Sequence, residues 1–333
     1  MRQYLIFTNY DCNLNCSYCY ECKKWKDVFD PEAAFQYVVK RIDKDSPSPG
    51  EDILVYCIGG EAFLYTEKLD AFFSKVAPYI RSLGCTPLLK VQTNGTLLTG
   101  DAQRSLLKKY SDCLYLGFSI DGAKAKHDRD RCGSFDATIA GLRAARSILP
   151  RDRFTVKATF TVQDIPFYAD DVTFLLGLDV KGVIANFAVQ EKIPMEQAST
   201  LAEQMCLVVR WMKEHPGCAE WAELKYPGDR VTLGCGLGGG ARCIAPNGEE
   251  YQCIQFACNK RTISPNWKEE MKRACAVCEN CILFHECNPC YAYTLGDAEH
   301  VRPWCVYTWA RAFARAFYML VTPEKEGALW KTK

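Results

Sequence analysis

The sequence predicts an α/β fold in which six parallel strands form a partial barrel, followed by a small cysteine-rich C-terminal domain. Between residues 1 and 216, short β-rich segments alternate with segments of helical periodicity. Six such units in series imply a parallel sheet with right-handed crossovers, and six rather than eight indicate a TIM-like (β/α)6 barrel that does not close. An open, doubly wound sheet fits the same alternation and remains an alternative.

Each unit pairs one strand with the helix that follows it. Strands are expected at residues 3–8, 52–57, 87–92, 113–119, 153–161 and 182–188, and helices near 31–43, 65–83, 100–110, 134–148, 167–176 and 196–214. Asp30 precedes Pro31, which suits a first helical turn, and Ser134 offers a cap for a later helix. Residues 217–229 are expected to form a linker, and an aromatic-rich helix near 304–319 is expected to pack the segment 306–333 back against the barrel.

Composition and charge limit the class of protein. The chain has 333 residues, of which 48% are hydrophobic and 24% charged, as in ordinary globular proteins. A net charge of +1 gives no electrostatic reason to bind nucleic acid or an anionic membrane. There is no signal peptide and no apolar run of the ~18 residues that would span a bilayer. We therefore expect a cytoplasmic protein without nucleic-acid or membrane partners.

Cysteine is the unusual residue, with 20 copies. A disulfide scaffold of this size would need an export signal, so this many thiols favour a metal protein. Ten of the cysteines lie between Cys235 and Cys305. Six others are scattered through the middle of the chain, and we expect them to be small buried hydrophobes: Cys57, Cys85, Cys113, Cys132, Cys206 and Cys218.

Three cysteines directly follow the first predicted strand. Cys12, Cys16 and Cys19 have C-x3-C-x2-C spacing, and thiolates spaced so closely are typical ligands of a [4Fe–4S] cluster. Three ligands leave one iron without a protein thiolate, where a small molecule can chelate. A zinc knuckle is the alternative, but it needs a fourth ligand, and the nearest extra thiol, Cys22, lies in the same tight segment.

The triplet, with Tyr18 just before its third cysteine, resembles the signature loop of the radical S-adenosylmethionine (SAM) enzymes. In that family SAM chelates the open iron through its amino and carboxylate groups. One electron from the cluster then cleaves SAM to methionine and a 5′-deoxyadenosyl radical, which removes a hydrogen atom from the substrate. The resemblance also implies the partial-barrel fold.

Further motifs lie where predicted strands end, and the resemblance implies that they bind SAM. Gly59-Gly60-Glu61 resembles the family's Gly-Gly-Glu-Pro motif, which holds the SAM amino group, although Ala62 replaces the proline. On its own this would be a tight turn, in which adjacent glycines let the backbone approach a ligand and Glu61 could accept from an ammonium group. Asn94-Gly95 resembles the family's strand-to-turn Thr-Asn-Gly. Ser119, Asp121 and Arg131 complete the expected SAM-binding set.

The charged segment after the fourth strand has two interpretations. A guanidinium pairs a carboxylate bidentately, so Arg131 is preferred over Arg129 as the group that would meet the SAM carboxylate. The alternative is a solvent-exposed loop whose charged residues bind nothing. We expect His127 and Asp128 to shape this loop rather than act as an acid–base pair.

Residues 230–305 have few apolar runs and need a metal to hold them. Their cysteines resemble the SPASM domain, the C-terminal extension of radical SAM enzymes that modify peptides and proteins. The resemblance implies one auxiliary [4Fe–4S] cluster on Cys278, Cys281, Cys287 and Cys305, and another on Cys235, Cys253 and Cys290. Cys243 is the preferred fourth ligand of the latter and Cys258 its rival. The interval before Cys290 is one residue shorter than in the family. Two zinc ribbons are the competing interpretation.

These expectations together predict a peptide-modifying radical SAM oxidoreductase with three [4Fe–4S] clusters. The favoured reaction is hydrogen abstraction from a ribosomally made precursor peptide, with a thioether or carbon–carbon cross-link as product. Sulfatase maturation, which forms formylglycine, is a less favoured alternative, because Ile254 follows Cys253 where those enzymes have an aspartate. A non-catalytic iron–sulfur or zinc protein is the second alternative. The expected partners are the precursor peptide and a low-potential flavodoxin- or ferredoxin-like electron donor. The peptide is expected to be brought either by a separate peptide-recognition protein or by direct docking of its leader on the edge of the barrel.

Overall fold

The structure is a computed structural model that describes residues 2–20, 25–225, 242–259, 264–274, 276, 281, 283 and 303–322. The strands are β1 (Arg2–Phe7), β2 (Asp52–Ile58), β3 (Thr86–Thr93), β4 (Leu114–Ser119), β5 (Phe154–Phe160), β6 (Gly182–Phe187), β7 (Glu220–Trp221), β8 (Cys243–Ile244) and β9 (Glu250–Tyr251). The α-helices are α1 (Pro31–Asp45), α2 (Thr66–Ser82), α3 (Asp101–Lys109), α4 (Lys124–Asp130), α5 (Phe135–Arg146), α6 (Tyr168–Leu176), α7 (Ala198–Glu214), α8 (Ile254–Asn259), α9 (Trp267–Ala274) and α11 (Pro303–Val321). Short 3-10 helices are η1 (Ala62–Tyr65), η2 (Arg151–Arg153), η3 (Val162–Phe167), η4 (Met195–Gln197) and η5 (Ala222–Leu224).

The chain divides into two compact units, each made of several segments. The first unit comprises Met1–Ile120, His127–Thr155 and Gly239–Thr262, and the second comprises Asp121–Lys126, Val156–Gly238 and Ile263–Lys333. The alternation of strand and helix expected from the sequence is confirmed in the order of the elements.

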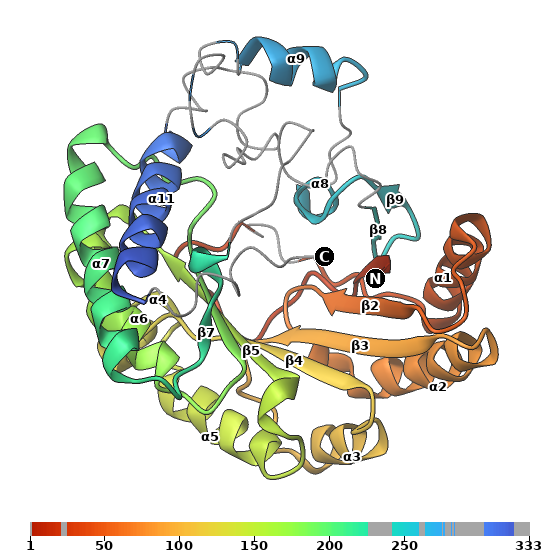
Figure 1. The fold of residues 1–333 in the computed structure, drawn as a ribbon. Coiled ribbons are helices and arrows are strands. Elements are labelled where there is room, and N and C mark those ends of the chain that lie inside the picture. The colour runs from red at the N-terminus through yellow and green to blue at the C-terminus, as the bar shows by residue number, and fades with distance from the viewer. Residues whose placement is uncertain are drawn as a thin grey trace. The chain divides into compact units, whose positions relative to one another are not determined.

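The first unit is built on a parallel sheet. Strands β1 to β4 pair in parallel, with Tyr4 opposite Val55 and Val55 opposite Leu89. Alternate residues on these strands are fully buried, among them Ile53, Val55, Leu89 and Val91. Helices α1, α2 and α3 cover one face of this sheet, as Figure 1 shows. The apolar core of the first unit therefore lies between the sheet and these helices.

The other edge of β1 is covered by the short strand β8, which also runs parallel to it, with Leu5 opposite Cys243 and Ile6 opposite Ile244. Strand β9 then pairs with β8 in the antiparallel direction. Residues 242–259 thus belong to the first unit, although they fall within the range 230–305 that we expected to be a separate domain. The reason is physical, because an uncovered edge of β1 would leave its backbone groups unpaired.

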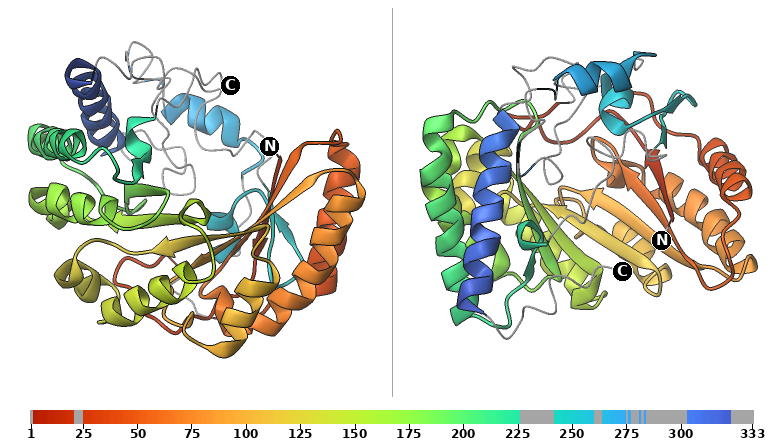
Figure 2. Two further views of the ribbon diagram at one scale, coloured as in Figure 1. Left: turned by 60° about the horizontal axis from the view of Figure 1, so that its bottom comes forward. Right: turned by 45° about the horizontal axis from the view of Figure 1, so that its top comes forward.

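The second unit contains strands β6 and β7, which pair in parallel with Val183 opposite Trp221. Strand β7 and helix η5 lie inside the range 217–229 that we expected to be a linker, and Trp221 is buried. Helices α7 and α11 lie side by side in Figures 1 and 2, and α6 packs against α7. The expected C-terminal helix is thus present as α11, and it packs along α7.

No helix among the described residues is both long enough and apolar enough to cross a membrane.

Candidate active site

The cysteine loop, which carries Cys12, Cys16 and Cys19, follows β1 and is hydrogen-bonded to three other segments of the first unit. The backbone N–H of Thr8 donates to Ile58 O at 2.8 Å, and that of Phe29 donates to Thr8 O at 2.7 Å. Farther along the loop, Ser17 N–H donates to Asp130 O at 2.9 Å, and Cys19 N–H donates back to Cys16 O at 3.1 Å. The last bond closes a turn between two of the predicted ligands, so their separation along the loop is fixed locally.

Gly59 and Gly60 are required by the cysteine loop itself. A Cβ on Gly60 would lie 2.0 Å from Asp11 O, and one on Gly59 would lie 2.6 Å from Asn9 O. The same close approach lets Gly60 N–H donate to Asn9 O at 2.7 Å and Glu61 N–H donate to Asp11 O at 3.0 Å. We expected these glycines to let the backbone approach a ligand. In the structure they let it approach the loop that carries the cysteines.

The carboxylate of Glu61 is buried and is used within the fold. One oxygen accepts from Thr93 Oγ1 at 2.7 Å and from Phe63 N–H at 3.2 Å, and the other accepts from Asn94 N–H at 2.7 Å. Burial raises the pKa of Glu61, whereas these hydrogen bonds and the charge of Arg131 act in the opposite direction. Glu61 therefore joins the turn after β2 to the end of β3. Its expected contact with an ammonium group stays a prediction.

Two predicted residues direct hydrogen-bond donors at the cysteine sulfurs. Asn94 Nδ2 lies 3.8 Å from Cys12 Sγ and 2.8 Å from Asn13 Oδ1. Arg131, which is buried, places Nη1 3.8 Å from Cys16 Sγ, and its guanidinium lies 5.5 Å over the ring of Tyr18. The structure thus brings Asn94, Arg131 and Tyr18 to the cysteine loop, where amide and guanidinium donors stabilise thiolate charge.

The donor set fits a [4Fe–4S] cluster. The three thiols are half-buried, and two of their sulfurs face the donors just described. Within the described part of the chain, no three His, Cys, Asp or Glu side chains gather around one point as the ligands of a single metal ion do. A cube does not require that convergence, because each thiolate binds a different iron.

The segment after β4 forms helix α4, where we expected a loop. His127 is fully buried and its Nε2 lies 3.1 Å from Ser134 Oγ, while Asp128 Oδ1 accepts from Phe135 N–H at 2.8 Å. The two residues were expected to shape a loop; they lie instead in α4 and contact the start of α5. The cap comes from Asp128, however, and Ser134 makes no side-chain capping bond.

The prediction that Cys132 is a buried hydrophobe is wrong. Its side chain is exposed, its φ is +56°, and its Sγ lies 3.1 Å from Asn15 O. Four of the scattered cysteines are buried as expected, whereas Cys218 is half-buried.

Ser119 ends β4 and accepts a hydrogen bond from Gln92 Nε2 at 3.0 Å. Asp121 lies two residues farther along the chain and belongs to the second unit. Asp121 is fully buried, and its Oδ1 accepts from Thr159 N–H at 2.9 Å. The binding of SAM by either residue stays a prediction.

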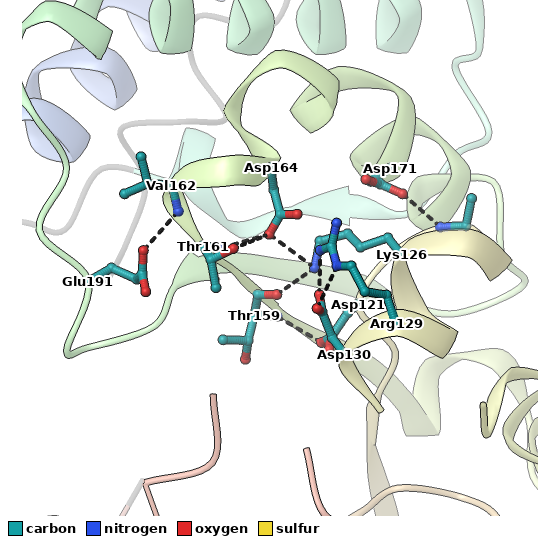
Figure 3. A network of polar contacts seen from close by, with 11 residues as sticks. Asp121, Lys126, Arg129, Asp130, Thr159, Thr161, Val162, Asp164, Asp171 and Glu191 are labelled. Carbon is teal, nitrogen blue, oxygen red and sulfur yellow. Dashed lines mark hydrogen bonds and ion pairs between the residues drawn. The ribbon is translucent and has the colours of Figure 1, made fainter. Parts of the chain in front are cut away.

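A buried ion pair lies beside Asp121 in the second unit. Figure 3 shows Lys126 between β5 and η3, where its Nζ donates to Thr159 O at 2.8 Å and lies 3.5 Å from Asp164 Oδ2. The same Asp164 oxygen accepts from Thr161 N–H at 2.7 Å. Because these polar groups are paired, the buried charges are tolerated and hold the segment after β4 against the end of β5.

Three of the predicted auxiliary ligands lie in the first unit. Cys243 begins β8 and is fully buried, Cys258 is buried in α8, and Cys253 is half-buried just before that helix. Cys243 is opposite Tyr251 in the β8–β9 pair, two residues before Cys253. In the second unit, Cys281 is exposed and Cys305 is half-buried on α11. The remaining predicted ligands lie outside the described residues: Cys235, Cys278, Cys287 and Cys290.

Several residues that organise the site were not singled out from the sequence. Asn9 is fully buried, and its Nδ2 donates to Asp11 O at 2.7 Å and to Glu61 O at 3.1 Å. Tyr65 donates to Asp11 Oδ2 at 2.7 Å. Gln92 on β3 accepts from the Tyr56 hydroxyl of β2 at 2.9 Å and donates to Ser119 Oγ of β4 at 3.0 Å. A usable signal exists only for Gln92, because a polar residue inside an otherwise apolar parallel strand is unusual.

Comparison with known proteins finds similarity to one superfamily over the part of the chain that contains the cysteine loop. Residues 6–167 match the model of the Radical SAM superfamily. An uncharacterized protein of Methanothermobacter thermautotrophicus is 28% identical over 208 residues, which cover 60% of this chain and 73% of that protein.

Solved structures with the same fold align with most of this chain. The structure of anSMEcpe with bound AdoMet and Kp18Cys peptide is 16% identical, covers 97% of this chain and 99% of that chain, and has a TM-score of 0.71. SuiB of Streptococcus suis bound to the precursor peptide SuiA is 15% identical, covers 79% of this chain and 61% of that chain, and has a TM-score of 0.56. The predicted α/β fold class, with a parallel sheet of the partial-barrel type, is confirmed, and the part of the chain that matches the Radical SAM superfamily model is residues 6–167.

Proposed function

We propose that this protein is a radical SAM peptide maturase, an oxidoreductase that cross-links a ribosomally made precursor peptide. One observation carries the proposal: the C-x3-C-x2-C loop is held against the turns after β2 and β3, and donors from Asn94 and Arg131 face two of its sulfurs. A plain electron carrier or a zinc knuckle has no need for the Gly59-Gly60-Glu61 turn that holds this loop.

In this proposal Cys12, Cys16 and Cys19 hold a [4Fe–4S] cluster whose fourth iron is left for SAM. Bound together, the two supply a 5′-deoxyadenosyl radical that removes a hydrogen atom from the peptide. Arg131 is the cation suited to the SAM carboxylate, since it lies beside Cys16. The remaining SAM-binding set lies at strand ends or in the cysteine loop: Tyr18, Gly59, Gly60, Glu61, Asn94, Ser119 and Asp121.

The favoured product is a thioether or carbon–carbon cross-link. Formation of a thioether removes one hydrogen atom from a carbon and one proton from a thiol, and it releases one electron. The electron released equals the one consumed in cleaving SAM, so a nearby electron acceptor completes the balance. Two auxiliary [4Fe–4S] clusters in a SPASM domain would provide that acceptor.

The expected auxiliary ligands remain Cys253, Cys281 and Cys305 among the described residues, together with those outside them. Cys243 stays the preferred fourth ligand of the cluster that includes Cys253, since both belong to the small β8–β9–α8 segment and Cys243 is paired close to Cys253 along the hairpin. Cys258 is in the same segment and stays the rival.

A precursor peptide is the proposed partner, together with a low-potential electron donor and a separate peptide-recognition protein. Two structures with the same fold contain peptides, Kp18Cys in anSMEcpe and SuiA in SuiB, and they support this choice.

The first experiment tests the chemistry. The protein is reconstituted anaerobically with iron and sulfide, reduced, and given SAM, and 5′-deoxyadenosine is measured by chromatography. We expect about 12 irons per chain for three cubes and release of 5′-deoxyadenosine. Replacing Cys12, Cys16 and Cys19 together by alanine should remove about four irons and all cleavage. The matched control is Cys218→Ala, which should retain both. Cleavage by the triple variant would refute the assignment of the loop.

The second experiment identifies the product. Small cysteine-rich peptides encoded beside the gene are coexpressed with the protein, and their masses are measured. Loss of two hydrogens per modified site supports a cross-link. Formylglycine on a Cys- or Ser-containing peptide would instead show the sulfatase-maturing reaction, against which Ile254 argues. Iron loading without any SAM cleavage would indicate the electron-transfer alternative.

A further inference from the structure

A row of hydrogen bonds crosses three strands of the first unit on the face away from helices α1–α3. Tyr56 on β2 donates its hydroxyl to Gln92 Oε1 at 2.9 Å, and Gln92 on β3 donates from Nε2 to Ser119 Oγ at 3.0 Å. All three side chains are half-buried. The row ends at Ser119, the last residue of β4 and a member of the proposed SAM-binding set.

The register of the strands makes this row diagonal. Tyr56 is opposite Lys90, two residues before Gln92, and Gln92 is opposite Gly117, two residues before Ser119. Each step therefore advances by two residues towards the carboxyl ends of the strands, where the active-site loops lie.

Gly117 makes room for the row. A Cβ at this position would lie 2.3 Å from Gln92 Oε1 and 3.4 Å from Lys90 Cε. Any larger residue would push the Gln92 amide away from the position in which it bridges Tyr56 and Ser119. Lys90 also packs over the Tyr56 ring, with Nζ 5.1 Å from its centre.

The order of donors and acceptors in the row has a chemical consequence. Burial raises the pKa of Tyr56, so its hydroxyl keeps its proton and acts as a donor at neutral pH. That bond leaves the Gln92 amide with Oε1 towards Tyr56 and Nε2 towards Ser119. A serine hydroxyl that accepts from an amide has its own proton available for another acceptor.

We propose that Tyr56 and Gln92 are positioning residues that make Ser119 a hydrogen-bond donor to an oxygen of bound SAM. This inference rests on the proposed function. The acceptor is either the SAM carboxylate or a ribose oxygen, and both present the same chemistry to the Ser119 hydroxyl. Tyr56 and Gln92 act through Ser119 and do not themselves need to touch SAM.

The test is a double-mutant cycle on SAM binding, measured by equilibrium dialysis with the anaerobically reconstituted protein. Gln92→Glu keeps the shape of the side chain, but its carboxylate accepts from both neighbours, so Ser119 must donate to it and loses the outward donor. We expect SAM to bind about tenfold more weakly to Gln92→Glu and to Ser119→Ala. The combined variant should bind no more weakly than Ser119→Ala, because the two changes remove the same bond.

The double-mutant cycle distinguishes loss of the Ser119 hydrogen bond from a direct effect of the negative charge that Gln92→Glu adds. A direct charge effect would still weaken SAM binding when Ser119 is alanine. Tyr56→Phe should give a smaller loss that also disappears in the Ser119→Ala background. Gln36→Glu, the same change at an exposed position of α1, is the matched control and should leave SAM binding unchanged.

Each result has one meaning. Independent, additive losses in the combined variant would overturn the inference while leaving the proposed function intact, as would wild-type affinity in Gln92→Glu. Failure of the wild-type protein to bind SAM would overturn both. Methylthioadenosine, which lacks the carboxylate, identifies the acceptor: sensitivity of its binding to Ser119→Ala indicates the ribose, and insensitivity indicates the carboxylate.

Discussion

Replacing Gly60 by alanine should displace the cysteine loop. The new Cβ would lie 2.0 Å from Asp11 O, and ordinary contact begins at 3.4 Å, so the two backbones must separate by about 1.4 Å. That movement breaks the bonds from Gly60 N–H to Asn9 O and from Glu61 N–H to Asp11 O, at about 1 kcal/mol each. With about 1–3 kcal/mol of overpacking, the expected loss of unfolding free energy is about 3–5 kcal/mol.

The assay for Gly60→Ala combines urea unfolding, followed by circular dichroism, with the iron content after anaerobic reconstitution. We expect a lower unfolding midpoint and loss of about four irons per chain, because the proposed ligands of one cluster are on the displaced loop. The matched control is Gly217→Ala, since a Cβ there meets nothing within 4 Å, and it should change stability by less than about 0.5 kcal/mol. A Gly60→Ala protein with the midpoint and iron content of the control would refute this reasoning.

Three further predictions test groups outside the cysteine loop. Burial raises the pKa of Glu223, so the free energy of unfolding should fall as the pH rises from the ordinary carboxyl pKa of 4.5 through the raised pKa of the folded protein. Glu223→Gln should make the free energy of unfolding depend less on pH, as measured by urea titrations at a series of pH values. The same pH dependence in the variant and the wild type would contradict this prediction. Asp128→Ala should lower the free energy of unfolding by about 1 kcal/mol through loss of the cap at Phe135 N–H, and Asp128→Asn should restore most of it; unchanged thermal unfolding would argue against the cap. Iodoacetamide should label exposed Cys132 in the native protein and reach buried Cys57 only after unfolding, as peptide masses would show; early labelling of Cys57 would contradict the packing.

The long elements of the fold could be predicted from the sequence because each carries its own signal. The six expected strands and six helices appear with ends shifted by only a few residues, since apolar strand segments alternate with amphipathic helices. Helix α1 also begins at Pro31 as expected, and Asp30 caps it, since its Oδ1 accepts from Ala33 N–H at 2.8 Å. Strands β7, β8 and β9 have two residues each, too few to show a period of two. Helix α4 was missed because its seven residues are almost all charged and carry no apolar repeat.

Within the site, the sequence predicted which residues gather better than what their side chains contact. Asn94, Arg131 and Tyr18 lie at the cysteine loop as the motif positions implied. The partners of Glu61 could not be predicted, because they depend on how closely the end of β3 approaches the turn after β2. The exposure of Cys132 likewise depends on a left-handed backbone at that residue, for which cysteine gives no local signal.

The motif residues around the cysteine loop mainly form hydrogen bonds with one another. In the proposed function, this affects which residues would select the substrate. The Gly59-Gly60 backbone, the Glu61 carboxylate and the Asn94 amide all have partners within the loops around the cysteines. Ala62, where the family has proline, is buried at the start of η1, and Glu61 still accepts from Phe63 N–H there, so this change leaves the turn intact. In the proposed function, residues committed to the loop in this way would fix the position of the cofactors but would have little freedom to select a peptide. Half-buried polar residues on the face of β2–β4 away from the helices are not committed to that loop. In the proposed function, discrimination among peptides should therefore depend on such residues, and exchanging Lys90 should alter substrate range more than cluster content.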